Sequence, residues 1–143
     1  VARLDNTGEV GVPIGRRPSL VNNLVKISAV FWSNWKGLFC KIVAGDIPST
    51  KVFEDDDFFA FRDINPQADT HLLLIPKKHL VNLDDLQPED AALMGKMLLT
   101  VPKLAKQENL EGYRTITNTG AKGGQEVFHM HFHILGGFKL PGF

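Results

Sequence analysis

The chain has 143 residues, of which 43% are hydrophobic and 22% are charged, values typical of one folded domain with its own core. Sixteen Lys and Arg balance sixteen Asp and Glu. This balance argues against a broad surface for nucleic acid or anionic membranes but permits a small anion site. The single cysteine, Cys40, excludes an internal disulfide and a zinc site built from cysteines. No apolar run approaches the roughly 20 residues that span a bilayer.

The first 36 residues differ from the rest, with five basic side chains against two acidic ones. A transit peptide, a flexible arm and a partner-binding segment are all compatible with this composition. We therefore expect residues 1–36 to be an extension without a role in the chemistry and residues 37–143 to form the domain. The expected location is the cytoplasm, or a mitochondrion or plastid if the extension derives from a transit peptide.

Residues 37–45 suit a short helix that ends at Gly45 and is followed by Pro48. Residues 54–57 are acidic and indicate a turn. Strand-like stretches occur at residues 49–54, 57–63, 70–79, 112–118 and 126–135. Strands joined by short loops or one helix predict an α+β domain with an antiparallel sheet.

The long helix is predicted over residues 87–110, where Pro88 suits the first turn. Its apolar stripe consists of Leu93, Met97, Val101 and Leu104. Pro102 lies inside this stretch and should kink the helix or end it early.

Three of the five histidines stand at alternate positions in residues 129–137, HMHFHILGG. On a strand, His129, His131 and His133 would share one face, because side chains repeat every two residues. Apolar residues would cover the other face, namely Phe128, Met130, Phe132 and Ile134. The pattern predicts one face for packing and one for chemistry.

Two kinds of chemistry fit a row of imidazoles. His-x-His can present two nitrogen ligands to zinc, with His71 or a carboxylate as the third. Alternatively, neutral imidazole can attack phosphorus, and its neighbours can stabilise phosphate oxygens. The glycine-rich stretch at 119–125 offers backbone N–H groups of the kind that bind phosphate. This loop favours phosphoryl chemistry without a metal.

The sequence resembles the histidine-triad (HIT) superfamily, whose pattern is His-x-His-x-His followed by apolar residues. The similarity extends from FCKIVAGDIPSTKVFEDDDFFAFRDINPQADTHLLLIPKKH to GGQEVFHMHFHILGG and covers about residues 37–137. It is closest to the Hint branch, the histidine-triad nucleotide-binding proteins. The resemblance implies a five-stranded antiparallel sheet with one long and one short helix. It also implies a homodimer with a continuous ten-stranded sheet.

The resemblance further implies hydrolysis of purine nucleoside 5′-phosphoramidates through a nucleotidyl-histidine intermediate, without a cofactor. His131 matches the nucleophile of the family, and His129 and His133 would assist around the phosphate. His71 matches the fourth family histidine and is assigned to the leaving-group side. Two alternatives stay open: a dinucleoside polyphosphate hydrolase, and a nucleotide-binding regulatory module with incidental hydrolysis.

Nucleotide-binding positions also transfer from the resemblance. Asp63 matches the ribose-binding aspartate, and Phe61 should line the base pocket. The other apolar pocket positions are Leu38, Phe39, Ile42, Ile47 and Ile64, and those near ribose and phosphate are Asn118, Gly124, Gln125 and Glu126. Glu126 replaces a serine of the animal members, so we expect its carboxylate to turn away from the phosphate or to relay protons.

Overall fold

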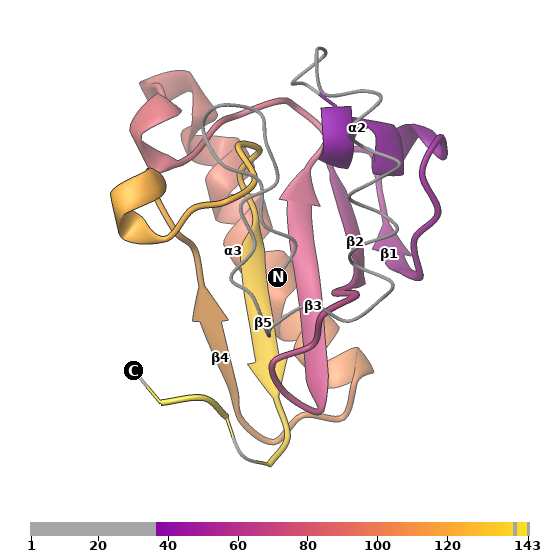
Figure 1. Cartoon of the computed structure of the whole chain (residues 1–143). Helices are drawn as coiled ribbons and strands as arrows, with labels where there is room; N and C mark the ends of the chain where they lie inside the picture. The colour runs from indigo at the N-terminus through magenta and orange to yellow at the C-terminus, as the bar shows by residue number, and fades with distance from the viewer. Residues whose placement is uncertain (1–36, 139, 143) are drawn as a thin grey trace.

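Five strands form one antiparallel sheet in the order β1-β2-β3-β5-β4 (Figure 1). The structure is a computed structural model that describes residues 37–138 and 140–142, so the expected extension over residues 1–36 lies outside the described residues. The strands are β1 (Lys51–Glu54), β2 (Phe58–Arg62), β3 (Thr70–Pro76), β4 (Tyr113–Ile116) and β5 (Phe132–Gly136). The prediction of an α+β domain with five antiparallel strands is confirmed.

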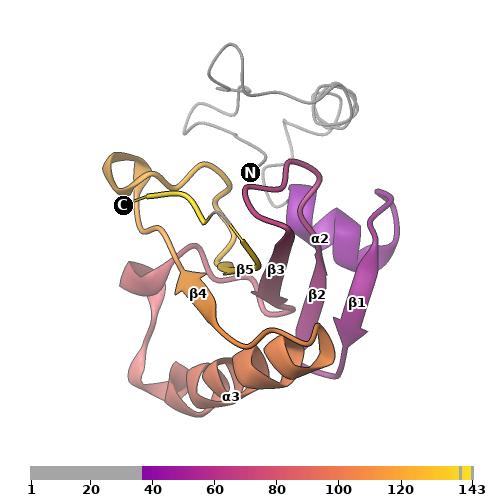
Figure 2. The ribbon, with the colours of Figure 1, turned by 90° about the horizontal axis from the view of Figure 1, so that it is seen from below.

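Two α-helices cover opposite faces of this sheet: α2 (Gly37–Ala44) and α3 (Ala91–Gln107) (Figure 2). Gly45, with a φ of 84°, follows α2 in the left-handed conformation that commonly ends a helix. Short 3₁₀ turns occupy Leu83–Asp85 (η1), Pro88–Asp90 (η2) and Ala121–Gly123 (η3). In the described part of the chain no helix has the length and apolarity needed to cross a membrane.

Each face of the sheet has its own buried cluster, because strand side chains alternate between the two sides. The cluster on the α2 side consists of Leu38, Phe39, Ile42, Ile47, Phe59, Phe61, Leu73, Ile75 and Val127. The cluster on the α3 side consists of Phe58, Ala60, Leu72, Leu74, Leu80, Met97, Val101, Leu104, Met130, Phe132 and Ile134. The α2 side also carries the chemical groups described below.

The long helix continues past Pro102, so the expectation that the proline ends it early is wrong. Helix α3 extends to Gln107, and Pro102 lies on its exposed side. Proline removes only one N–H, whose acceptor would be the carbonyl of Leu98. Leu98 is itself 58% exposed, so the missing bond lies on the solvent-facing side of the helix. The buried residues Val101 and Leu104 hold the helix against the sheet across this point.

The last strand is shorter than predicted: β5 begins at Phe132, whereas the alternation predicted a strand from residue 126. Residues 127–129 form bends. Burial nevertheless follows the predicted alternation, since Met130, Phe132 and Ile134 belong to the α3-side cluster, although Phe128 is only half-buried. His133 is therefore in the sheet ladder, whereas His129 and His131 precede it.

Gly136 and Gly137 end β5, and Gly137 lies in a tight turn. Gly137 has a φ of 99°, a conformation that residues with a side chain rarely adopt. A Cβ atom there would lie 2.6 Å from Cβ of Asp69. Oδ2 of the same aspartate accepts a hydrogen bond from Phe138 N–H at 3.0 Å. This turn is thus fixed by backbone geometry and close packing.

Candidate active site

Four histidines gather on the α2 side of the sheet: His71 on β3, His133 on β5, and His129 and His131 just before β5. Each is only 3% exposed. The ring centroids of His131 and His133 are 4.9 Å apart, and those of His71 and His133 are 5.2 Å apart. The structure therefore brings together the four residues predicted to be catalytic.

The hydrogen bonds of His131 leave one ring nitrogen available for chemistry. Its Nδ1–H donates to the carbonyl oxygen of His129 at 2.7 Å. In a neutral imidazole the lone pair is then on Nε2. The backbone of His131 is held as well, because Oγ1 of Thr117 donates to its carbonyl at 2.9 Å. His131 thus has the tautomer that a nucleophilic Nε2 requires.

A chain of hydrogen bonds fixes the tautomers of His71 and His133. Gln67 N–H donates to Nδ1 of His71 at 3.0 Å, so the neutral ring carries its proton on Nε2. This Nε2 lies 2.9 Å from Nδ1 of His133. His133 then has its own proton on Nε2, an atom that is buried and finds no acceptor among the described residues. This N–H can serve a bound anion beside His131.

Asp63 lies at the same site, immediately after β2. Its Oδ2 is 3.3 Å from Nε2 of His71, and its Oδ1 accepts a hydrogen bond from Asn65 N–H at 2.8 Å. Asp63 as a whole residue is only 6% exposed. Its negative charge favours the protonated form of His71 and so partly opposes the effect of burial on the pKa of that ring.

Burial keeps the four imidazoles neutral. It lowers the pKa of His71 and of His129 to about 4, and the pKa values of His131 and His133 also lie below the ordinary value of 6.5. Neighbouring histidines lower the pKa of His133 further, because two cations would repel each other at these distances. Neutral rings are the form that attack on phosphorus requires.

An apolar pocket next to the histidines collects most of the predicted nucleoside-binding residues. It is lined by Leu38, Phe39, Ile42, Pro48, Ser49, Phe61, Asp63, Ile64 and Leu73. Phe39 joins this pocket to the histidines, since its ring meets His131 edge-on at 5.2 Å and Phe61 at 5.6 Å. Ile47 is buried in the adjacent cluster but does not line the pocket.

Pro48, Ser49 and Leu73 line the pocket but were not predicted. For Leu73 a signal existed, because it lies two residues from His71 on the same strand face. Pro48 and Ser49 lie between α2 and β1, and no periodicity in the sequence indicates where that connection folds.

The predicted residues around the glycine loop occupy different environments. Asn118 donates from Nδ2 to the carbonyl of Gly124 at 3.4 Å, within the loop itself. Gly124 is exposed and has a φ of 90°. Gln125 is buried, whereas Glu126 is half-buried. Asn118 and Gly124 thus shape the loop, and their contact does not involve the histidines.

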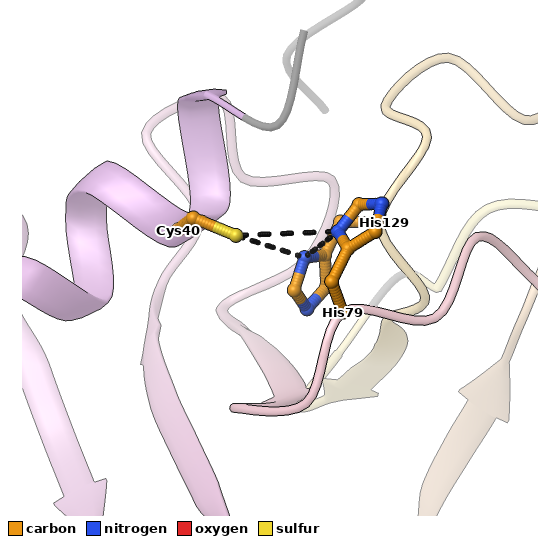
Figure 3. Close-up of side chains that lie close together, drawn as sticks. All are labelled: Cys40, His79 and His129. Carbon is orange, nitrogen blue, oxygen red and sulfur yellow. Dashed lines mark hydrogen bonds between the residues drawn. The ribbon is translucent and has the colours of Figure 1, made fainter.

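A second cluster shares His129 with the histidine row and also contains Cys40 and His79 (Figure 3). Sγ of Cys40 is 3.7 Å from Nδ1 of His129 and 4.0 Å from Nδ1 of His79, and the two Nδ1 atoms are 3.0 Å apart. His129 directs its Nε2–H to the carbonyl of Pro76 at 2.8 Å, so its Nδ1 carries a lone pair. Sequence spacing gave no sign of this cluster, because its members come from three separate segments.

These three side chains could hold a soft divalent cation. One thiolate and two imidazole nitrogens within 4.8 Å of one another are donors that zinc prefers. A second group, Asp63, His71 and His133, also has ligand atoms within this distance. In each group the two imidazoles also contact each other, with 3.0 Å between Nδ1 of His79 and Nδ1 of His129 and 2.9 Å between Nε2 of His71 and Nδ1 of His133. Neither group corresponds to the predicted alternative of two neighbouring histidines on one strand face.

Comparison with known proteins now places the chain in a family. The HIT domain profile matches residues 44–140. The protein HitA of Neisseria gonorrhoeae is 53% identical over 100 residues, which span 69% of this chain and 94% of HitA. The purine nucleoside phosphoramidase of Escherichia coli K12 is 46% identical over 105 residues, which span 72% of this chain and 88% of that protein. The chain belongs to the HIT domain family.

Solved structures agree with this assignment. A HIT family hydrolase from Legionella pneumophila superimposes with a TM-score of 0.70 at 51% identity, and the match covers 73% of this chain and 95% of that one. A histidine triad protein from Clostridium difficile gives a TM-score of 0.70 at 47% identity, over 73% of this chain and 93% of that one. The fold expected from the sequence is thus the fold of the family.

Proposed function

We propose that the protein hydrolyses purine nucleoside 5′-phosphoramidates to the nucleoside monophosphate through a nucleotidyl intermediate on His131. The observation that carries this proposal is the pair of opposite tautomers at the site. His131 has a lone pair on Nε2, and His133 next to it has a buried N–H without an acceptor in the described part of the chain. The E. coli relative named purine nucleoside phosphoramidase supports this choice of substrate.

The proposed reaction has two balanced steps. Nε2 of His131 attacks the phosphorus, a P–N bond to imidazole forms, and the P–N bond to the leaving amine breaks. The amine takes one proton from the solvent as it leaves. Water then attacks the phosphorus, His131 leaves, and the water returns that proton. The Nε2–H of His133 stabilises the charge on a phosphate oxygen, and His71 acts through His133 because it fixes that ring's tautomer.

The nucleoside would occupy the apolar pocket beside Phe39. Its base packs against Phe61 and the aliphatic residues, which recognise shape rather than a particular polar edge. Asp63 stands at the pocket and offers carboxylate oxygens to the ribose hydroxyls. This order of apolar pocket, carboxylate and histidines matches the order of base, ribose and phosphate in a nucleotide.

A substrate panel tests the proposal. Adenosine and guanosine phosphoramidates should be hydrolysed with kcat/KM at least about tenfold above diadenosine polyphosphates, because the proposed mechanism engages a single phosphate at His131 and His133. Product formation would be followed by chromatography. A preference for dinucleoside polyphosphates would favour the first alternative, and nucleotide binding without turnover would favour the regulatory module.

Chelation supplies the control for this panel. None of the proposed steps uses a metal, so exhaustive treatment with EDTA should leave the rates of phosphoramidate hydrolysis unchanged. A rate that falls on chelation and returns with added zinc would contradict the proposed mechanism. It would point to the group Cys40, His79 and His129 or to the group Asp63, His71 and His133.

We also infer a homodimer. Support comes from exposed apolar side chains on α3 and on the edge strand β4: Leu98 is 58% exposed, Leu99 67% and Tyr113 41%. A second copy could cover them and extend the sheet at β4.

Light scattering should give twice the chain mass at micromolar concentration, and Leu99→Glu should shift the protein toward the monomer. Leu83→Glu, at a leucine that is 44% exposed on η1, is the matched control and should remain dimeric.

A further inference from the structure

The geometry points to Gln125 as a positioning residue that sets the phosphate-binding segment through its side chain, rather than as a nucleotide contact. The kinetic test of this inference rests on the proposed function. A second test, the affinity for AMP, does not depend on hydrolysis. Gln125 lies between the glycine loop and the bent segment that carries His129 and His131. It is 3% exposed, so its amide must find partners inside the protein.

All the ordinary hydrogen-bonding capacity of this amide is used within the chain. Oε1 accepts from Asn82 Nδ2 and from Gly120 N–H, both at 2.9 Å. Nε2 donates to the carbonyls of Val81 at 2.7 Å and of Val127 at 3.1 Å. Two donors and two acceptor lone pairs are thereby satisfied. The side chain therefore has no group left for a nucleotide, and its four partners define what it does.

The first effect of these bonds is to close the glycine loop. The backbone N–H of Gln125 donates to Gly120 O at 3.0 Å, while Gly120 N–H donates back to the Gln125 side chain. Gly120 and Gly124 have positive φ values of 76° and 90°, which allow the chain to reverse within a few residues. The loop thus has a defined conformation at the point where it enters the segment before β5.

The second effect is to tie the segment 125–130 to the segment 76–82, which follows β3. Apart from Pro76, the last residue of β3, neither segment is part of a strand. Besides the bonds from Gln125 to Val81 and Asn82, three bonds join them. His129 Nε2–H donates to Pro76 O at 2.8 Å, Met130 N–H donates to Leu80 O at 2.6 Å, and Nδ1 of His79 lies 3.0 Å from Nδ1 of His129. Side chains therefore supply most of the support that a continuous strand would have given to His129 and His131.

The bent segment before β5 could bind an anion, because several of its backbone N–H groups do not bond to other backbone groups. The N–H groups of Val127, Phe128 and His129 have no backbone acceptor within residues 37–138 and 140–142. They precede the nucleophile His131 by two to four positions, and Gln125 fixes the carbonyl of Val127 directly. Backbone donors in a bent segment form good anion sites only when their directions are held. Gln125 holds them.

The test uses Gln125→Glu, which keeps the size of the side chain but removes both N–H donors and sets a carboxylate against two carbonyls. At pH 7.5 we expect the affinity for AMP to fall by about tenfold or more and kcat for adenosine phosphoramidate by about 10–100-fold. The affinity for adenosine, which has no phosphate, should stay within about twofold of the wild type, because the base pocket is separate. Binding would be measured by calorimetry.

The pH dependence of the Gln125→Glu variant separates positioning from general damage. When the introduced carboxylate is protonated it regains one donor, and the neighbouring carbonyls favour that form. The ratio of variant to wild-type kcat should therefore rise as the pH falls from 8 to 5. Gln107→Glu is the matched control, because Gln107 also donates to a carbonyl, that of Val52, but lies exposed at the end of α3. Gln107→Glu should leave the affinity for AMP, the affinity for adenosine and kcat unchanged.

Asn82→Asp keeps the hydrogen-bond acceptor that caps η1 but removes the donor to Gln125. It should also weaken AMP binding, but by less than Gln125→Glu does. It replaces Gln125→Glu as the test variant if that protein does not fold. Unchanged AMP affinity in these variants, or an equal loss of adenosine affinity, would overturn the inference. A wild-type protein that binds AMP but does not hydrolyse the phosphoramidate would instead refute the proposed function.

Discussion

Replacement of His131 by asparagine should lower kcat for adenosine phosphoramidate by about 10³-fold or more, equivalent to at least about 4 kcal/mol of transition-state stabilisation. Asparagine can still donate to the carbonyl of His129, as Nδ1 of His131 does at 2.7 Å. It cannot form the covalent intermediate, because an amide nitrogen is not a nucleophile toward phosphorus. Single-turnover kinetics with the purified variant would measure the loss.

Two controls give this result its meaning. The variant should bind adenosine with wild-type affinity, because the apolar pocket does not include His131. It should also unfold at a temperature well above that of the assay. If His131→Asn hydrolyses the substrate at a near-normal rate, the covalent mechanism is wrong. A change in KM alone would assign His131 to binding.

The free energy of unfolding should fall by several kcal/mol between pH 6.5 and about 4, because the active site buries neutral imidazoles. The pKa of His71 and of His129 is about 4 in the folded protein, against 6.5 for the unfolded chain. Between these values the unfolded state binds more protons, so acid favours unfolding. The contribution is complete above pH 6.5 and is lost progressively as the pH falls toward 4. Urea unfolding at pH 7, 6, 5 and 4.5 would measure it.

His71→Gln provides the comparison for this experiment. The variant removes one titrating group and should show a shallower fall over the same range. Its stability at pH 7 is a separate quantity, since it also loses the bonds of His71 to Gln67 and His133. An unfolding free energy that does not change between pH 6.5 and 4.5 would show that the rings are already solvated or charged.

The residues predicted best from the sequence were those whose position follows from periodicity. Phe59 and Phe61 are two residues apart in β2, and both belong to the α2-side cluster, where Phe61 lines the pocket with Asp63. Alternation in residues 128–134 placed Met130, Phe132 and Ile134 on the packing face, and these residues belong to the α3-side cluster. The alternation of apolar residues along a strand indicates which side chains are buried, and these predictions depended only on burial.

Alternation could not show where β5 begins, because that depends on which backbone groups find partners far along the chain. Residues 126–131 alternate like a strand, yet Met130 N–H bonds to Leu80 and the His129 side chain bonds to Pro76. The cluster of Cys40, His79 and His129 was missed for a related reason. Its members come from three segments that only the folded chain brings together, so a search for a zinc site made of several cysteines could not find it.

The motif HMHFHILGG contains two requirements that are physically independent. In the proposed mechanism the histidines serve a reacting phosphorus, whereas Gly137 belongs to a turn in which Asp69 leaves no room for a methyl group. Any side chain at Gly137 would meet both this contact and a φ of 99°. A chain of this fold could therefore lose its chemistry and still keep the glycine, so the glycine identifies the architecture and only the histidines identify an enzyme.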